Sequence, residues 1–296
     1  MKFNVDDLVE KGLVKKKTYT EGIYKGLSVL KYSRKVFFDN LWHLDERLLE
    51  CRGIVVGEND NVIVLPFKKV FNLGENDTQV DPELMVTCPR KVNGFMAAAT
   101  LTDKYGLIVS TTGTLDSEFA VLARKWIEKG KWGSLWTGRT YLFEICDPSD
   151  PHIVDEDAGE YLIGCRFVTT GEMLSEEDLE LESLFLNYKR PEVLKCTFKD
   201  LPLAIKHEGY MVRDSSTGET LCKIKSNYYL VKKALIRMGK NRSSLMFNNP
   251  LEFRKQIDEE FYDLHKYILD NYTLEQYTSF NQEERRNIFD NYFKKD

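Results

Sequence analysis

The chain has 296 residues, 42% of them hydrophobic and 30% charged, a balance typical of a folded protein with a substantial core. Its net charge of −5 argues against a protein that coats nucleic acid non-specifically, but it is compatible with a local basic groove. No apolar run reaches the length of a membrane span, and the charged N-terminus lacks the apolar centre of a secretory signal. We therefore expect a cytoplasmic protein that has no membrane partner.

Short β-type runs dominate residues 26–225. Turn signals at Asn59–Asn61, Asp103–Gly106 and Ser215–Gly218 each separate two segments rich in β-branched or aromatic residues, which predicts hairpins. These hairpins, with helices between them, predict an α+β fold built on antiparallel sheets.

Helical signals interrupt the β-type runs twice. One predicted helix is capped by Asp116 or Ser117 and stops at Gly130, and a second is capped by Ser175. The first, with Trp126 on its apolar side, is expected to belong to the core, and the second begins with a solvated acidic turn that favours the helix dipole.

Amphipathic helical patterns take over after about Tyr228. Three segments show this pattern, and Pro250 fits the first turn of a helix. We expect an α+β domain over residues 1–235 and a small all-helical domain over residues 236–296. The basic stretch from Lys232 to Arg242 is either a surface for an RNA backbone or a solvated helix face.

Cysteines and histidines show no spacing typical of a metal site. The four histidines lie far apart, and no two cysteines form a C-x-x-C pair. We therefore expect the six cysteines to be reduced and mainly buried: Cys51, Cys88, Cys146, Cys165, Cys196 and Cys222.

Two groups of lysines stand out as candidates for chemistry. Lys91 and Gly94 form a K-x-x-G pattern, which taken alone is more simply a surface charge at the end of a strand. A lysine nucleophile has to lose its proton, which requires burial or neighbouring positive charge. Lys223 and Lys225 project to one face of a predicted strand, either as a solvated edge pair or as a clamp for a phosphate.

Two glutamates lie in or beside apolar strands. Glu144 is flanked by Phe143 and Ile145, and Glu208 precedes the strand "GYMVRD". A carboxylate there is either exposed on the wet side of a sheet or directed at a ligand hydroxyl or a metal. Each glutamate alone is weak evidence.

The order of these elements carries more information than any one of them. Four patterns follow one another along the chain: K-x-x-G, a strand with an apolar–Glu pair about fifty residues later, an E-G-aromatic strand and K-apolar-K. This series resembles motifs I, III, IV and V of the covalent nucleotidyltransferases, which comprise the polynucleotide ligases and capping enzymes. The segment "EYLIGCRF", with Arg166, looks like the region between motifs III and IV. The segments "LECRGIVV", "FKKVFNLGEN", "STTGT", "FEICDPSDPHIV" and "KIKSNYYL" are similar to the bacteriophage RNA ligase 1 family. The resemblance covers residues 32–230.

This resemblance implies roles for matching residues. Lys91 would be the nucleophile that takes AMP from ATP, and Glu208 would act with the catalytic metal. Contacts to the nucleotide are implied for Tyr32, Arg52, Lys69, Gly94, Glu144, Lys223 and Lys225. Asn93 departs from the pattern, because an acidic residue is common there.

The implied activity is ATP-dependent joining of 5′-phosphate and 3′-hydroxyl RNA ends with Mg²⁺, for which Mn²⁺ can substitute. The implied substrate is single-stranded RNA or a broken tRNA-like loop in RNA repair, with an end-healing kinase–phosphatase as a partner. We expect a monomer, in the host cytoplasm if the source is viral. Alternatives are a capping guanylyltransferase, a non-catalytic RNA-binding module and a DNA ligase. The helical C-terminal region, shorter than in the best-known relatives, leaves RNA preference open.

Overall fold

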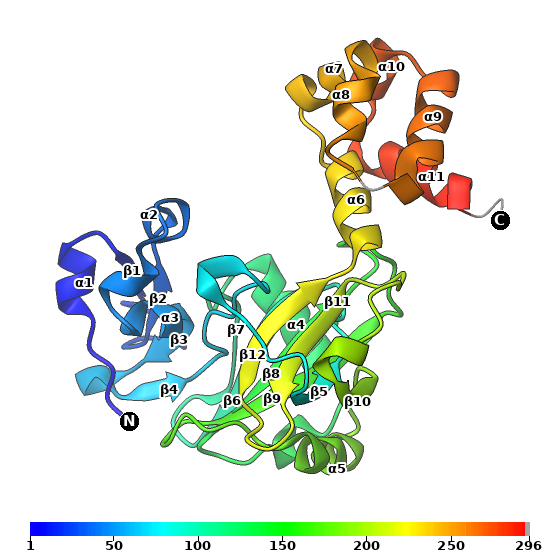
Figure 1. Cartoon of the computed structure of the whole chain (residues 1–296). Helices are drawn as coiled ribbons and strands as arrows, with labels where there is room; N and C mark the ends of the chain where they lie inside the picture. The colour runs from blue at the N-terminus through cyan, green and yellow to red at the C-terminus, as the bar shows by residue number, and fades with distance from the viewer. Residues whose placement is uncertain (258, 294–296) are drawn as a thin grey trace.

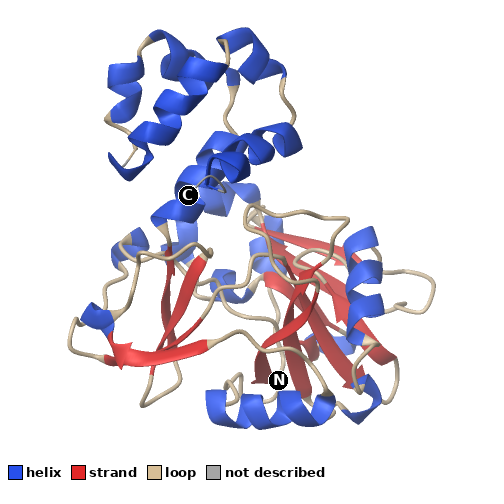
Figure 2. Cartoon of the chain, turned by 90° about the vertical axis from the view of Figure 1, so that its right-hand side faces the viewer, coloured by secondary structure: helices blue, strands red, loops and turns tan. Residues whose placement is uncertain are grey.

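The computed structural model describes residues 1–257 and 259–293 of the chain (Figure 1). Three four-stranded sheets, in which all neighbouring strands run antiparallel, form the β-rich part, and helices form the C-terminal part (Figure 2). The mixed α/β architecture with antiparallel sheets expected from the sequence is therefore confirmed. No helix of the described residues is long and apolar enough to cross a membrane.

The N-terminal sheet has the strand order β1-β2-β3-β4. Its strands are β1 (Val14–Thr18), β2 (Ser28–Tyr32), β3 (Arg52–Val56) and β4 (Val62–Val64). Short helices lie around this sheet: α1 (Asp6–Glu10), α2 (Arg34–Phe38), η1 (Leu41–Leu44), α3 (Arg47–Glu50) and η2 (Glu58–Asp60). Figure 1 shows this unit as a separate lobe at the N-terminal end of the chain.

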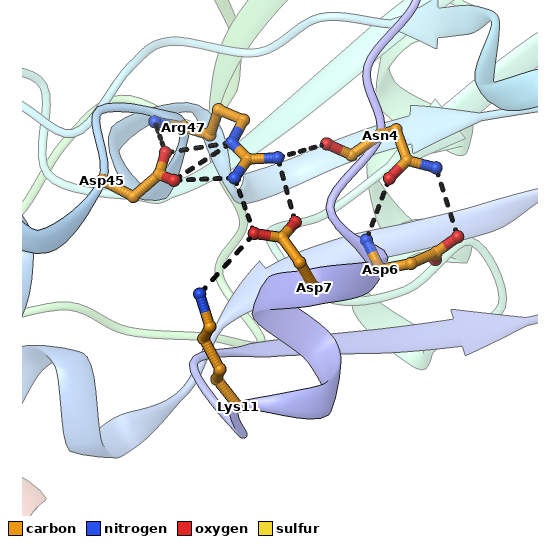
Figure 3. Close-up of polar contacts among 6 residues, drawn as sticks. All are labelled: Asn4, Asp6, Asp7, Lys11, Asp45 and Arg47. Carbon is orange, nitrogen blue, oxygen red and sulfur yellow. Dashed lines mark hydrogen bonds and ion pairs between the residues drawn. The ribbon is translucent and has the colours of Figure 1, made fainter.

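An arginine of α3 fastens the N-terminal segment to this lobe (Figure 3). The guanidinium of Arg47 donates to Asp45 at 2.7 Å and to Asp7 at 2.9 Å, and it also donates to the carbonyl of Asn4 at 2.9 Å. The Arg47 guanidinium lowers the pKa of both carboxyl groups through hydrogen bonds. Because both carboxylates keep their charge, the bonds hold α1 against α3 over the working pH range.

The other two sheets lie next to each other in the centre of the molecule (Figure 1). The second sheet has the order β10-β5-β11-β12, with β5 (Met85–Pro89), β10 (Val193–Thr197), β11 (Gly209–Asp214) and β12 (Thr220–Lys225). The third sheet has the order β7-β6-β8-β9, with β6 (Phe95–Thr102), β7 (Gly106–Ser110), β8 (Arg139–Cys146) and β9 (Gly159–Phe167). The hairpins β3–β4, β6–β7 and β11–β12 confirm the three predicted turns.

Two helices pack on the third sheet. Helix α4 (Glu118–Ile127) is capped by the Ser117 hydroxyl, and α5 (Glu176–Leu186) is capped by Ser175, as predicted. Helix α4 ends three residues before Gly130, where any side chain would collide with the Tyr188 ring. The core between these helices and the sheet includes Ala123, Ile127, Tyr141, Phe143, Leu179 and Leu186. Other short turns of helix are η3 (Glu75–Asp77), η4 (Trp132–Ser134) and η5 (Phe198–Asp200).

The C-terminal helices have their own hydrophobic cluster. They are α6 (Asn227–Ile236), α7 (Lys240–Asn248), α8 (Pro250–Arg254), η6 (Glu259–Phe261), α9 (Tyr262–Asn271), α10 (Leu274–Ser279) and α11 (Gln282–Phe293). Pro250 occupies the first turn of α8, as predicted. The last two predicted segments are each divided: the second ends its first helix at Arg254, and the third is interrupted at Phe280, which is extended. Residues 258 and 294–296 lie outside the described residues.

Helix α6 links the two parts of the chain. Tyr229 and Ile236 pack against Ile153 of the loop after β8, while Val231 and Leu235 join the C-terminal cluster. Lys232 belongs to the basic stretch that was expected to be a surface for an RNA backbone or a solvated helix face. At Lys232 neither expectation holds, because its side chain is buried and ion-paired with Asp290 of α11. The proposed boundary between residues 235 and 236 stays a prediction.

Candidate functional site

A cavity of about 820 Å³ lies where the three sheets meet. Arg52 lines it from the N-terminal sheet, Lys223 from the second sheet and Glu144 from the third. Lys91 and Gly94 line it from the connection between β5 and β6. A volume of this size lies in the range of sites for nucleotides and other small ligands.

Lys91 follows β5, and its backbone N–H donates to the carbonyl of Gly209 at 2.8 Å. This bond fixes the start of the loop against β11 and directs the side chain to Glu208, whose Oε2 lies 3.1 Å from Lys91 Nζ. Burial acts to lower the pKa of Lys91, but the charges of Glu144 and Glu208 outweigh it and raise the pKa above its ordinary value. Lys91 is therefore an ammonium group in the free protein at neutral pH.

Gly94 allows the K-x-x-G turn to approach β8 closely. A Cβ atom at this position would lie 2.2 Å from the carbonyl oxygen of Ile145, a distance that no side chain tolerates. The backbone N–H of Gly94 donates to Glu144 Oε1 at 3.1 Å. Glycine at this position thus lets the lysine loop lie directly against the glutamate strand.

Glu144 and Glu208 are both buried, at 8% and 2% relative exposure. This excludes the wet-side alternative that the sequence left open for Glu144. Burial raises the pKa of Glu144; the charge of Lys91 opposes this rise and that of Glu208 adds to it. Glu208 Oε1 also lies 3.4 Å from Lys225 Nζ, so Glu208 stands between two lysines.

Asn93 holds Glu208 in place. Its amide Nδ2 donates to Glu208 Oε2 at 2.6 Å, while its Oδ1 accepts from the backbone N–H of Val154 at 2.9 Å. Its own N–H donates to Glu156, which forms a two-bond ion pair with Arg90. An amide meets both demands at this buried position, since it is donor and acceptor at once.

Four cations lie close enough to influence one another, and two of them, Arg52 and Lys223, line the cavity. Lys223 Nζ donates to the carbonyl of Val70 at 2.9 Å, and Lys69 Nζ lies 3.6 Å from Glu75. Burial, and then the charges of Lys69, Arg52 and Lys225, lower the pKa of Lys223 to about 8. Burial also lowers the pKa of Lys69, against the charge of Glu75. The group consists of Arg52, Lys69, Lys223 and Lys225, and we call it the cation cluster.

A cluster of mutually repelling cations is the physical signature of an anion site. The carboxylate of Glu75 opposes the lowering of the pKa of both Lys69 and Lys223, but it does not cancel that lowering. A bound phosphate chain would replace repulsion by ion pairs and return the pKa of Lys223 toward its ordinary value.

Tyr32 lies outside the lining of the cavity. Its ring makes an edge contact with Trp42, at 4.8 Å between centroids, and Trp42 contacts Phe71 in turn. The ammonium of Lys69 lies over the rings of both Trp42 and Phe71. Tyr32 thus reaches the cation cluster through two aromatic side chains rather than by direct contact.

Several lining residues were not expected from the sequence. Phe95 and Phe119 form an edge-to-face pair on one wall, and Ile163 and Met211 line another. Strand alternation offered a signal for Met211, which lies two residues after Gly209 on β11. No local pattern marks Phe119, because its place depends on how α4 packs on the sheet.

Within the described part of the chain, no group of three or more His, Cys, Asp or Glu side chains could hold a metal ion. The two buried carboxylates of Glu144 and Glu208 still fit a hard divalent cation. Mg²⁺ is usually held by one or two carboxylates together with substrate phosphates and water.

Comparisons with known proteins agree with this geometry. Two structures of an archaeal ATP-dependent RNA ligase, described as form 1 and form 2, match with TM-scores of 0.61 and 0.57 at 14% identity. The matches cover 94% and 95% of this chain and 76% and 74% of those chains. A putative ATP-dependent DNA ligase from Aquifex aeolicus matches with a TM-score of 0.52 at 16% identity, over 98% of this chain and 77% of that one. At these identities, the likeness shows the fold.

A comparison with curated protein sequences found no relative. The family model described as RNA ligase matches residues 50–229, which is more than half of the chain and contains Lys91, both glutamates and the cation cluster. The chain therefore belongs to the RNA ligase family, whose members are enzymes that join RNA.

Proposed function

We propose that this enzyme joins RNA ends at the expense of ATP and carries AMP covalently on Lys91. One observation carries the proposal: Lys91 Nζ lies 3.1 Å from a buried carboxylate, and Lys91 lines the same cavity as Arg52 and Lys223 of the cation cluster. A nucleophile with acid residues beside it and an anion site facing it is the arrangement that nucleotidyl transfer requires.

In the first step, Lys91 Nζ attacks the α-phosphorus of ATP. The P–N bond forms, the bond from the α-phosphorus to the bridging oxygen breaks, and pyrophosphate leaves. The attacking amine must be neutral, so the ammonium found in the free protein has to give up a proton. ATP brings its own negative charge to the cation cluster, and a divalent cation would compensate the carboxylates that hold the proton on Lys91.

The cation cluster would bind the leaving pyrophosphate. Lys223, with its pKa lowered to about 8, gains most from an added anion, because the anion ends its repulsion by Lys69 and Arg52. Glu208, with Glu144, would hold the divalent cation, which supplies positive charge to the transferred phosphate. Asn93 would keep Glu208 in that position.

Two further steps complete the joining reaction. A 5′-phosphate oxygen of the RNA attacks the phosphorus of the lysyl-AMP, the P–N bond breaks, and Lys91 is released with an adenylylated RNA end. A 3′-hydroxyl then attacks the 5′-phosphorus, and AMP leaves while the phosphodiester bond forms. Both steps pass through negatively charged transition states, which the same cations stabilise.

We propose single-stranded ends, including broken tRNA-like loops, as the substrates, with Mg²⁺ as the metal. Such ends need a 5′-phosphate and a 3′-hydroxyl, so an end-healing kinase–phosphatase would act before this enzyme. We further propose that residues 236–296 form a separate helical domain that contributes to RNA preference, and that the enzyme is a monomer of the cytoplasm, that of the host if its source is viral.

The direct test is incubation with α-labelled ATP and Mg²⁺. We expect acid-labile label on the wild-type protein and none on Lys91→Ala. Lys199→Ala is the matched control, since Lys199 is an exposed lysine paired with Glu83. Label from GTP but not ATP would instead indicate capping chemistry, and label on Lys91→Ala would refute the assignment. Sealing of nicked DNA but not of single-stranded RNA would refute the proposed substrate.

A further inference from the structure

Helix α2 exposes two neighbouring aromatic rings. Phe37 is 51% exposed and Phe38 is 75% exposed, and their rings meet edge to face at 5.4 Å between centroids. Among the residues of this short helix, only Val36 is buried in the core of the lobe. The two phenylalanines therefore contribute little to folding, and their exposure calls for another explanation.

Basic residues precede these rings in the sequence. Lys31, Arg34 and Lys35 are exposed, and none of the three forms an ion pair with any residue that the structure describes. The segment Lys31–Asn40 contains these three basic residues and a single acidic one, Asp39. Unpaired cations beside exposed aromatic rings are the combination that binds single-stranded nucleic acid, since bases stack on the rings and phosphates meet the cations.

A second exposed apolar surface provides an internal contrast. Helix α5 exposes Leu181, Leu184 and Phe185, at 59% or more. Its sequence, EEDLELESLFL, contains five acidic residues and no basic one. The field of α5 repels a phosphate backbone, whereas that of α2 attracts it.

The α2 surface is continuous with the active-site cavity. Lys31 precedes α2 on β2, lines the cavity, and pairs in register with Arg52 of β3. Tyr32 leads through Trp42 to the cation cluster. Figure 1 shows α2 on the N-terminal lobe. An RNA strand whose end lies in the cavity would reach α2 by passing Lys31.

We propose that Lys31, Arg34, Lys35, Phe37 and Phe38 form a stacking surface for the unpaired nucleotides next to the RNA end that is joined. This inference rests on the proposed function, and it adds a location and a mode of RNA binding. Phe37 and Phe38 receive bases, and the three cations hold the phosphates between them. Such a surface selects single-stranded over double-stranded ends, because only unpaired bases can leave their stack.

The test compares Phe37→Ala/Phe38→Ala with wild type and with Phe185→Ala, the matched control on α5. The probe is a short 5′-phosphorylated single-stranded RNA containing 2-aminopurine, whose fluorescence reports stacking. We expect the Kd and the KM for this RNA to rise about tenfold for each ring removed. Self-adenylylation, which needs no RNA, should stay within about twofold, and Phe185→Ala should behave as wild type.

Conservative and charge variants complete the test. Phe37→Trp/Phe38→Trp should keep the affinity for the RNA. Arg34→Ala/Lys35→Ala should reduce the slope of log Kd against log salt by about 0.7 for each phosphate that is no longer neutralised. Unchanged RNA affinity and fluorescence in Phe37→Ala/Phe38→Ala would overturn the proposal, as would an equal loss in Phe185→Ala. Because binding is measured without ATP, a wild type that binds RNA but takes no label would refute the proposed function alone.

Discussion

Lys91 and Lys223 are lysines of the same cavity with opposite electrostatic environments. Two carboxylates raise the pKa of Lys91, although burial acts to lower it. Burial and three cations lower the pKa of Lys223 to about 8. The residue type therefore does not determine the pKa; burial and the sign of the neighbouring charges do.

This difference assigns the two lysines different tasks. The ammonium of Lys223 is destabilised by the neighbouring cations, and a bound phosphate chain would relieve this repulsion. Lys223 is therefore suited to binding phosphate. Lys91 is held as an ammonium by Glu144 and Glu208 until positive charge reaches those carboxylates. In the proposed reaction, activation of Lys91 and binding of ATP would therefore be coupled through charge.

Of the substitutions considered, Glu208→Gln should change the difference between Lys91 and Lys223 most. The substitution keeps the shape but removes the charge next to Lys91, and with it the proposed metal ligand. We expect the plateau rate of self-adenylylation to fall by at least about 100-fold. The rising limb of the pH–rate profile should move to lower pH, because loss of the carboxylate lowers the pKa of Lys91.

Single-turnover labelling across a pH series measures both effects. Glu83→Gln is the control, since Glu83 is an exposed glutamate with a lysine partner of its own. A plateau within about threefold of wild type would contradict the role of Glu208, and a limb that moves to higher pH would contradict the electrostatic account of Lys91.

The next effect concerns the cation cluster. Lys223→Met should raise the KM for ATP by roughly 10- to 100-fold, as expected for loss of one charged hydrogen bond to a phosphate. It should also change how stability depends on pH. The folded pKa of Lys223 is about 8, below its ordinary value of 10.5, so the unfolded chain binds the extra proton between these values.

The free energy of unfolding of the wild type should consequently gain a contribution that rises between about pH 8 and pH 10.5. Lys223→Met should lose this contribution, which chemical denaturation at several pH values would measure. Lys199→Met serves as the control, being an exposed lysine. An unchanged pH dependence in Lys223→Met would show that the cluster does not depress the Lys223 pKa.

Sequence patterns predicted much of this site because they are local. Strand alternation placed Lys223 and Lys225 on one face, and the turn signal at Ser215–Gly218 located the hairpin that follows Glu208. The K-x-x-G pattern marked Gly94, and the structure shows why a side chain is excluded there, since a Cβ atom would lie 2.2 Å from the carbonyl oxygen of Ile145.

The remaining features depend on tertiary packing. Phe119 reaches the cavity only because α4 packs on the third sheet, and Lys232 is buried only because α11 brings Asp290 to it. The last predicted segment is interrupted at Phe280, which is extended, and the amphipathic pattern alone conceals this break. The sequence did not show what Asn93 does, because its hydrogen-bond partners Glu208 and Val154 are far away in sequence.

The smallest expected effect comes from Asn93→Asp, which restores the acidic residue common at this position. The new carboxylate would lie where an amide now donates to Glu208 at 2.6 Å, so it would replace a hydrogen bond by repulsion. Lys91 and Lys225 favour its charged form, and the added charge should raise the pKa of Lys91 further. We expect self-adenylylation near neutral pH to slow by roughly three- to tenfold and to recover as the pH rises.

Asn93→Ala separates charge from position, because it removes the hydrogen bond without adding a carboxylate. Its rate should fall without a shift of the rising limb, whereas Asn93→Asp should move that limb to higher pH. If both variants lowered the rate equally at every pH, Asn93 would act only by holding Glu208 in place. The pH of the limb would then depend on Glu144 and Glu208 alone, and the identity of the third residue of K-x-x-G would matter for geometry rather than for charge.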